Sequence, residues 1–151
     1  RSYDSVDFRK TKRIGLLIWF RLSRIYNQSI RKNNEHLKQW NLTSAQFDVL
    51  VQVGIKKAMT QKELAQKLFV TKGNITQLLS KMEKLGLIQR KQEWKTKTIS
   101  LTDTGRQLFE EVVPDQEHFQ SSHFHGLDPQ EQEQLLTLLK KLQKNIESDN
   151  Q

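Results

Sequence analysis

Cysteine is absent from the 151-residue chain, and apolar runs are short. The absence of cysteine excludes disulfide bonds, thiolate zinc sites and thiol redox sensors. The longest apolar run, residues 14–20, is far shorter than the ~20 residues of a membrane-spanning helix. No stretch has the pattern of a signal peptide. We therefore expect a cytoplasmic protein that makes no membrane contact.

Acidic residues are scarce in the first two-thirds of the chain. Residues 1–100 carry 21 Lys and Arg against 7 Asp and Glu, whereas residues 101–151 carry 4 against 10. Such asymmetry favours a basic face that binds nucleic acid, built by the first two-thirds. The alternative is a solvated, lysine-rich surface, which the charge count alone does not exclude.

Motifs of catalysis are also missing. The sequence contains no phosphate-binding glycine loop, no Gly-x-Ser-x-Gly and no metalloprotease motif. We therefore expect neither an enzyme nor a cofactor. His118, His123 and His125 lie close together, but a zinc site needs three or four converging ligands and this spacing fixes no such geometry. Solvated histidines are the favoured interpretation, with metal sensing as the alternative.

Helix-start signals recur along the chain. Residues 43–46 and 60–63 have the form of capping boxes, and Asp128 precedes a proline suited to a first helical turn. Helices are predicted to begin near residues 44, 61, 72, 103 and 129, after an N-terminal helix at about 7–33. Between them, residues 88–91 and 97–101 are predicted strands of a β-hairpin with a basic tip at residues 92–97. The predicted fold class is mainly α with a small β-hairpin.

The predicted helix 72–85 has two different faces. Its apolar residues fall in an arc of about 120° and should face a core; they are Ile75, Leu78, Leu79, Met82 and Leu85. The opposite face is polar and basic, and Thr71 is a natural N-cap. A short helix at 61–69 precedes it, which is the helix-turn-helix arrangement, and the hairpin that follows makes it a winged helix. An ordinary surface helix would instead show mixed charge and i,i+4 Glu–Lys pairs.

Gly73 lies in the first turn of this helix, on its polar face. Glycine in a helix interior costs roughly 1 kcal/mol relative to alanine. A position without Cβ allows the helix backbone to approach DNA closely. We therefore predict that Gly73 is part of the DNA-binding surface.

The terminal helical regions, residues 1–36 and 106–151, carry more apolar surface than the central unit could cover. Burial against a second copy is the economical explanation, and a self-contained helical bundle is the alternative. We therefore predict a winged helix-turn-helix domain at 37–105 and a dimerisation region formed by the two terminal segments.

Three segments resemble the MarR family of bacterial transcription regulators. They are LTSAQFDVL (42–50), TQKELAQKLFVTKGNITQLLSKMEKLGLIQR (60–90) and ISLTDTG (99–105). The resemblance implies a homodimer that binds pseudo-palindromic operators in double-stranded DNA, usually as a repressor. It also implies release by a small phenolic or other lipophilic effector, as often occurs in the family. By position, the residues matching the family's recognition-helix contacts are Thr71, Lys72, Asn74, Thr76, Gln77 and Lys81. Arg90 matches the arginine that closes the strand before the wing, and it is also predicted to be part of the DNA-binding surface.

The hairpin departs from the family pattern. Family wings usually contain an Asp-Arg pair whose arginine reaches the minor groove, whereas this wing reads QEWKTK. Either Lys95 or Lys97 substitutes for that arginine, or the wing contributes only weak phosphate binding. Arg90, without the family's ionic lock, is expected to be free for another partner. Trp94 at the tip of the wing is expected to pack on the wing's own base, on DNA sugars or on a partner, and packing on the wing is the favoured interpretation. By analogy, an effector pocket would include Trp19, Trp40 and Phe47, although each fits a plain core as well.

The principal alternative to DNA binding is a winged-helix module whose outer face binds protein. Salt dependence separates the two, because DNA binding releases counterions and weakens steeply as salt rises.

Overall fold

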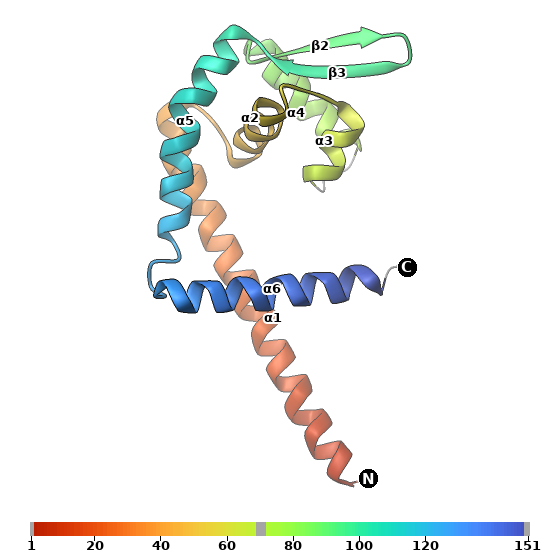
Figure 1. The fold of residues 1–151 in the computed structure, drawn as a ribbon, viewed down its shortest axis with the longest axis vertical. Coiled ribbons are helices and arrows are strands. Elements are labelled where there is room, and N and C mark those ends of the chain that lie inside the picture. The colour runs from red at the N-terminus through yellow and green to blue at the C-terminus, as the bar shows by residue number, and fades with distance from the viewer. Residues whose placement is uncertain (1, 69–71, 150–151) are drawn as a thin grey trace. The chain divides into compact units, whose positions relative to one another are not determined.

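The computed structural model describes the backbone of residues 2–68 and 72–149, and the side chains of 7–68 and 73–149. Six α-helices, a 3-10 turn and a three-stranded sheet follow one another through these residues (Figure 1). In chain order they are α1 (Ser2–Leu37), η1 (Lys38–Trp40), α2 (Ser44–Lys56), β1 (Ala58–Thr60), α3 (Gln61–Leu68), α4 (Lys72–Lys84), β2 (Ile88–Glu93), β3 (Thr96–Leu101), α5 (Asp103–Ser122) and α6 (Pro129–Ser148).

The predicted starts of α2, α3 and α6 are confirmed by local hydrogen bonds. Thr43 and Gln46 cap α2 reciprocally, and Asp128 and Glu131 do the same for α6. At α3 the hydroxyl of Thr60 accepts from the backbone N–H of Glu63 at 3.1 Å. Each box satisfies backbone donors that the helix itself leaves unpaired, so these starts are set by neighbouring residues alone.

The core of the winged helix is formed by α2, α3, α4 and the sheet. It includes Leu50, Val53, Leu64, Leu79 and Ile99, none of which is exposed to solvent. The predicted buried face of α4 is confirmed at Ile75, Leu79 and Met82. Leu85 was wrongly placed on that face: α4 ends at Lys84, and the Leu85 side chain is 53% exposed.

The sheet differs from the sequence prediction in two ways. A third strand, β1, pairs with β3, so that the strand order is β1-β3-β2. The hairpin strands are also longer than predicted, because the pairing continues to Glu93 opposite Thr96. The tip therefore consists of Trp94 and Lys95, and not of the six residues 92–97.

The segment 101–105 joins the wing to α5 through close backbone contact. The Thr102 hydroxyl donates to Gly86 O at 2.5 Å and accepts from Gly105 N at 3.0 Å, while Thr102 N donates to Leu87 O at 3.1 Å. A Cβ on Gly105 would overlap the carbonyl oxygen of Leu87. Glycine is required here because the backbone of α5 approaches the backbone of Leu87 too closely for any side chain.

Two compact units divide the chain, residues 1–116 and 117–151. In the first, α1 carries exposed apolar side chains between Phe8 and Tyr26, and in the second α6 exposes Leu136, Leu138, Leu139, Leu142 and Ile146. Within residues 2–68 and 72–149, no helix combines the length and apolar character needed to cross a bilayer.

Candidate nucleic-acid interface

The outer face of α4 presents short polar and basic side chains to solvent. Gly73, Asn74, Thr76, Gln77 and Lys81 are all exposed. Glu83 is the sole acid of the helix, and it lies near the C-terminal end. The first turn of a helix offers unpaired N–H groups and a positive dipole end, both suited to phosphate oxygens. The N-terminal end of this face can therefore approach DNA, because no acidic side chain of α4 lies there to repel the phosphates.

Gln61 positions one of the predicted contacts. Its Nε2 donates to the Thr76 hydroxyl at 3.1 Å, which links the first residue of α3 to the outer face of α4. Gln61 was missed in the sequence, since 15 positions separate it from Thr76 and no motif marks the pair. The one signal available in the sequence was that Gln61 follows Thr60 at the predicted start of a helix.

Arg90 is not free for another partner, contrary to expectation. Its Nη2 pairs with Glu83 Oε1 at 3.0 Å and donates to the Ser80 hydroxyl at 3.3 Å. The hydrogen bond from Arg90 lowers the pKa of Glu83 below its usual range, so the carboxylate stays charged and the pair intact at neutral pH. Arg90 therefore joins β2 to α4, and its positive charge balances the negative charge of Glu83.

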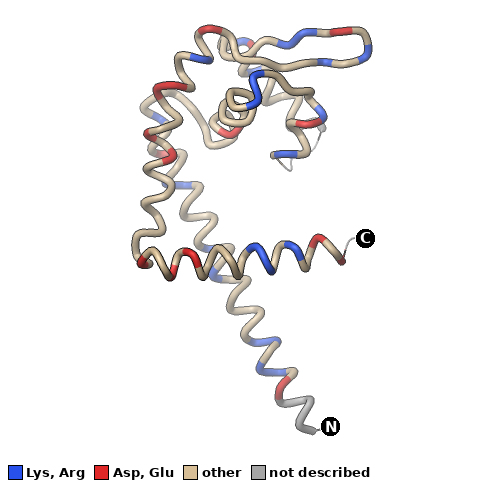
Figure 2. The backbone as a smooth tube through the Cα atoms, viewed as in Figure 1, with Lys and Arg blue, Asp and Glu red and all other residues tan. Residues whose placement is uncertain are grey.

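The wing lies beside α3 and α4 and is strongly basic. Figure 2 shows Lys and Arg distributed along the hairpin. Residues 88–101 contain four basic residues, Arg90, Lys91, Lys95 and Lys97, and one acidic residue, Glu93. A groove of about 1140 Å³ separates the wing from the two helices. It is lined by Thr60, Gln61, Lys62, Ala65, Gln66, Ile75, Thr76, Arg90, Gln92, Lys95, Thr96 and Lys97. The predicted wing cations therefore share one concave, cationic surface with Thr76 of α4.

Trp94 does not pack on the base of the wing. Its side chain is 87% exposed at the tip of the hairpin, and its backbone φ is +56°. Two further predicted contact residues cannot be placed. Thr71 lies outside the described residues, and for Lys72, the first residue of α4, the structure describes the backbone and not the side chain.

The three aromatic residues predicted for an effector pocket lie in different surroundings. Phe47 belongs to the core of the winged helix, and Trp19 is 66% exposed on α1. Trp40 lies 21 positions after Trp19, most of them helical, which corresponds to about 30 Å along the helix. Within one chain the three side chains therefore do not line a common pocket.

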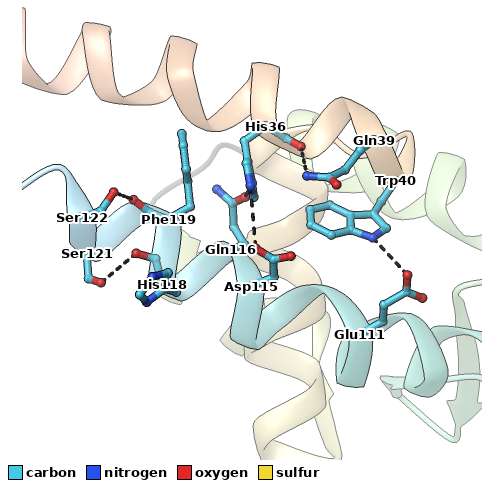
Figure 3. Close-up of polar contacts among 10 residues, drawn as sticks. All are labelled: His36, Gln39, Trp40, Glu111, Asp115, Gln116, His118, Phe119, Ser121 and Ser122. Atoms are coloured by element: carbon cyan, nitrogen blue, oxygen red, sulfur yellow. Dashed lines mark hydrogen bonds and ion pairs between the residues drawn. The ribbon is translucent and has the colours of Figure 1, made fainter.

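Trp40 belongs instead to a polar cluster between the end of α1 and α5 (Figure 3). Its Nε1 donates to Glu111 Oε1 at 3.2 Å, and its ring meets the His36 imidazole edge-on at 5.5 Å. His36 Nδ1 lies 2.6 Å from the oxygen of the buried Gln116 side chain, and its Nε2 lies 3.8 Å from Asp115. His36, which the sequence left without a role, therefore connects the two helices.

The remaining histidines form no recognisable metal centre. Within the described part of the chain, no group of three or more His, Asp or Glu side chains is placed to hold a metal ion. His123 instead packs edge-on against Phe119 with 4.9 Å between ring centroids. Near them the Ser121 hydroxyl donates to the backbone oxygen of His118 at 2.9 Å.

A short helix, a second helix with a polar and basic outer face, and a basic hairpin define the winged helix-turn-helix class of DNA-binding proteins. Residues 40–93 match the model of the MarR family. A helix-turn-helix transcriptional regulator of Bacillus cereus (strain ATCC 10987 / NRS 248) is 50% identical over 135 residues, covering 89% of this chain and 92% of that protein. The chain therefore belongs to the MarR family, which consists of transcription regulators and not of enzymes.

Solved structures of similar proteins include one bound to operator DNA and one of a regulator whose DNA binding responds to a small molecule. A variant of MarR from E. coli complexed with operator DNA is 25% identical, with a TM-score of 0.71 over 80% of this chain and 89% of that one. BpsR of Bordetella bronchiseptica, whose DNA binding is regulated by 6-hydroxynicotinic acid, is also 25% identical, with a TM-score of 0.75 over 83% and 93%.

Proposed function

We propose that the chain is a homodimeric repressor that binds a pseudo-palindromic operator in double-stranded DNA. The outer face of α4 carries this proposal, since it offers exposed polar side chains beside a cationic groove and has its one acid paired with Arg90. In this role α4 enters the major groove with Thr71, Lys72, Gly73, Asn74, Thr76, Gln77 and Lys81, while Lys95 and Lys97 contact the DNA from the wing. Arg90 acts by holding β2 against α4.

DNA binding is tested by electrophoretic shift of duplexes selected from a random library, at two salt concentrations. We expect binding to weaken steeply with salt, because each phosphate contact releases a counterion. Lys97→Ala should weaken binding to all sequences alike and reduce the salt slope by about 1. Gln77→Ala should instead change base preference, at a cost of about 1–3 kcal/mol at one position.

The two variants control for each other, since both truncate exposed side chains of the same surface. The opposite pattern, with base preference altered by Lys97→Ala, would show that the readers are misassigned. Failure of the wild-type chain to enrich any duplex at low salt would refute DNA binding and favour a protein-binding module.

Homodimerisation is proposed from the apolar band at residues 14–20 of α1. At 100° per residue these side chains point to all sides of the helix, and five consecutive ones from Leu16 to Phe20 are exposed. A helix that is apolar all round is normally buried. A second copy of the chain is the proposed cover, and twofold symmetry then places the half-sites about one helical turn, roughly 34–36 Å, apart.

We expect Ile18→Asp to shift the protein from dimer to monomer in size-exclusion chromatography with light scattering. A carboxylate buried in an apolar interface would lose its hydration without gaining a partner. Ile55→Asp is the matched control, since Ile55 is 67% exposed on α2 while Ile18 is 48% exposed on α1. Equal masses for wild type and Ile18→Asp, both dimeric or both monomeric, would contradict this role of the band.

Release by a small phenolic or other lipophilic effector completes the proposal. BpsR, whose DNA binding responds to a hydroxylated aromatic acid, supports it by similarity. Of the aromatic residues predicted for the pocket, half-buried Trp40 is the best placed in the single chain, because hydrogen-bonding groups of His36 and Glu111 lie beside it. A cytoplasmic location is part of the same proposal, as the place where such a regulator meets DNA.

A further inference from the structure

Trp94 lies in the turn at the tip of the wing. The register pairs Glu93 with Thr96, which leaves Trp94 and Lys95 as a two-residue turn. With 87% of its surface exposed, Trp94 is the most exposed of the large apolar side chains described. Tryptophan buries about 150–250 Å² when it is covered, so leaving it in water forgoes a large favourable contact. A partner surface that covers this indole would recover that contact.

The backbone at Trp94 is unsuited to tryptophan. Its φ of +56° lies in the left-handed region, where glycine and asparagine are the usual residues of a tight hairpin turn. A bulky residue held there is strained, and such strain concentrates at sites that bind ligands. The turn does not require an aromatic side chain at this position, and the exposed ring contributes little to the core.

The surroundings of Trp94 fix the turn and add positive charge. Gln92 Nε2 donates to the backbone oxygen of Trp94 at 2.9 Å, and the Lys95 ammonium lies 4.8 Å from the centre of the indole ring. Lys95 and Lys97 also line the cationic groove between the wing and α4. An aromatic ring flanked by an ammonium group matches a site where a base step and a phosphate lie next to each other.

We propose that Trp94 enters the minor groove beside the half-site read by α4 and acts as an apolar wedge that partly unstacks one base step. Lys95 contacts a phosphate next to that step. Insertion is least costly at flexible pyrimidine–purine steps, so Trp94 makes binding depend on the flanking sequence. This inference rests on the DNA binding proposed above. It assigns a role in sequence specificity to a residue of the wing, outside the recognition helix.

The test uses the full-length protein and duplexes that the wild type selects from a random library, with 2-aminopurine placed at successive flanking steps. Trp94→Asn keeps a residue that tolerates positive φ but removes the ring, whereas Trp94→Phe keeps an aromatic ring. We expect Trp94→Asn to weaken binding about 10-fold and to abolish both the preference for flexible flanking steps and the rise in 2-aminopurine fluorescence. Trp94→Phe should retain most of both effects.

Neither substitution changes charge, so the salt slope should stay that of the wild type. Trp94→Gly, which also accepts positive φ, provides a second ring-free variant should the asparagine protein fold poorly. Selected duplexes that bind Trp94→Asn or Trp94→Gly as well as wild type would overturn the inference and leave the proposed function standing. Weaker binding with unchanged 2-aminopurine fluorescence would overturn it too, because the step would then remain stacked. A wild type that selects no duplex refutes the proposed function itself.

Discussion

Replacement of Gly73 by leucine is expected to abolish operator binding and to leave the protein folded. An added Cβ meets no atom of the described residues within 4 Å, so a side chain at 73 has room in the free protein. On DNA the same side chain would stand between the first turn of α4 and the groove floor. Binding should fall by about 10³-fold or more, to the level of non-specific association. Fluorescence anisotropy with a selected duplex measures it.

Gly73→Ala gives a graded version of the same experiment. Alanine in the helix should raise the free energy of unfolding by up to about 1 kcal/mol, while its methyl group still weakens DNA binding. Stability and affinity are thus expected to change in opposite directions. Gly126→Leu is the matched control, since an added Cβ is equally unobstructed there but lies outside the winged helix. Equal operator affinity in Gly73→Leu and wild type would reduce the glycine to a tolerated defect.

Replacement of Gly105 by alanine is expected to destabilise the winged helix by about 2 kcal/mol or more. The added methyl group would overlap the carbonyl oxygen of Leu87, and a backbone atom cannot turn aside as a side chain does. Relief requires α5 to move away from the turn, which would break the hydrogen bonds that Thr102 makes to Gly86 and Leu87. Urea unfolding followed by circular dichroism measures the loss.

Gly54→Ala is the control for crowding by a side chain. A Cβ on Gly54 would meet the ring of Phe109, which is partly buried and can rotate or shift. We therefore expect a smaller destabilisation than for Gly105→Ala, although both positions are buried glycines within helices. The reverse order of the two unfolding free energies would contradict the requirement for backbone approach at Gly105.

Local signals predicted the fold well where the determining contacts are local. The starts of α2, α3 and α6 depend on residues three positions apart. The buried face of α4 follows from the helical spacing of its own apolar residues, without information from any other segment. Strand β1 was missed because its three residues pair with β3 some 40 positions later, at Met59 opposite Ile99. Nothing within Ala58–Thr60 distinguishes it from a loop.

The site was predictable in its surface but not in its internal contacts. Exposure of Asn74, Thr76 and Gln77 follows from helical periodicity. The pairing of Arg90 with Glu83 could not be deduced, because it joins a strand to a helix across a turn whose geometry depends on tertiary packing. Packing of Trp94 on the base of the wing was wrong for a different reason: an isolated aromatic residue suggests burial, whereas the tight turn directs this one into solvent. Contact of Trp94 with DNA or with a partner stays a prediction.

The apolar band of α1 has a consequence for how the protein responds to its own abundance. A fold that buries residues 14–20 only by pairing would lose that burial on dilution, since dissociation is favoured as protein concentration falls. Operator occupancy would then depend on roughly the square of the subunit concentration instead of rising in proportion to it. The promoter would then switch over a narrow range of regulator concentration, and that range would be set by dimerisation without any effector.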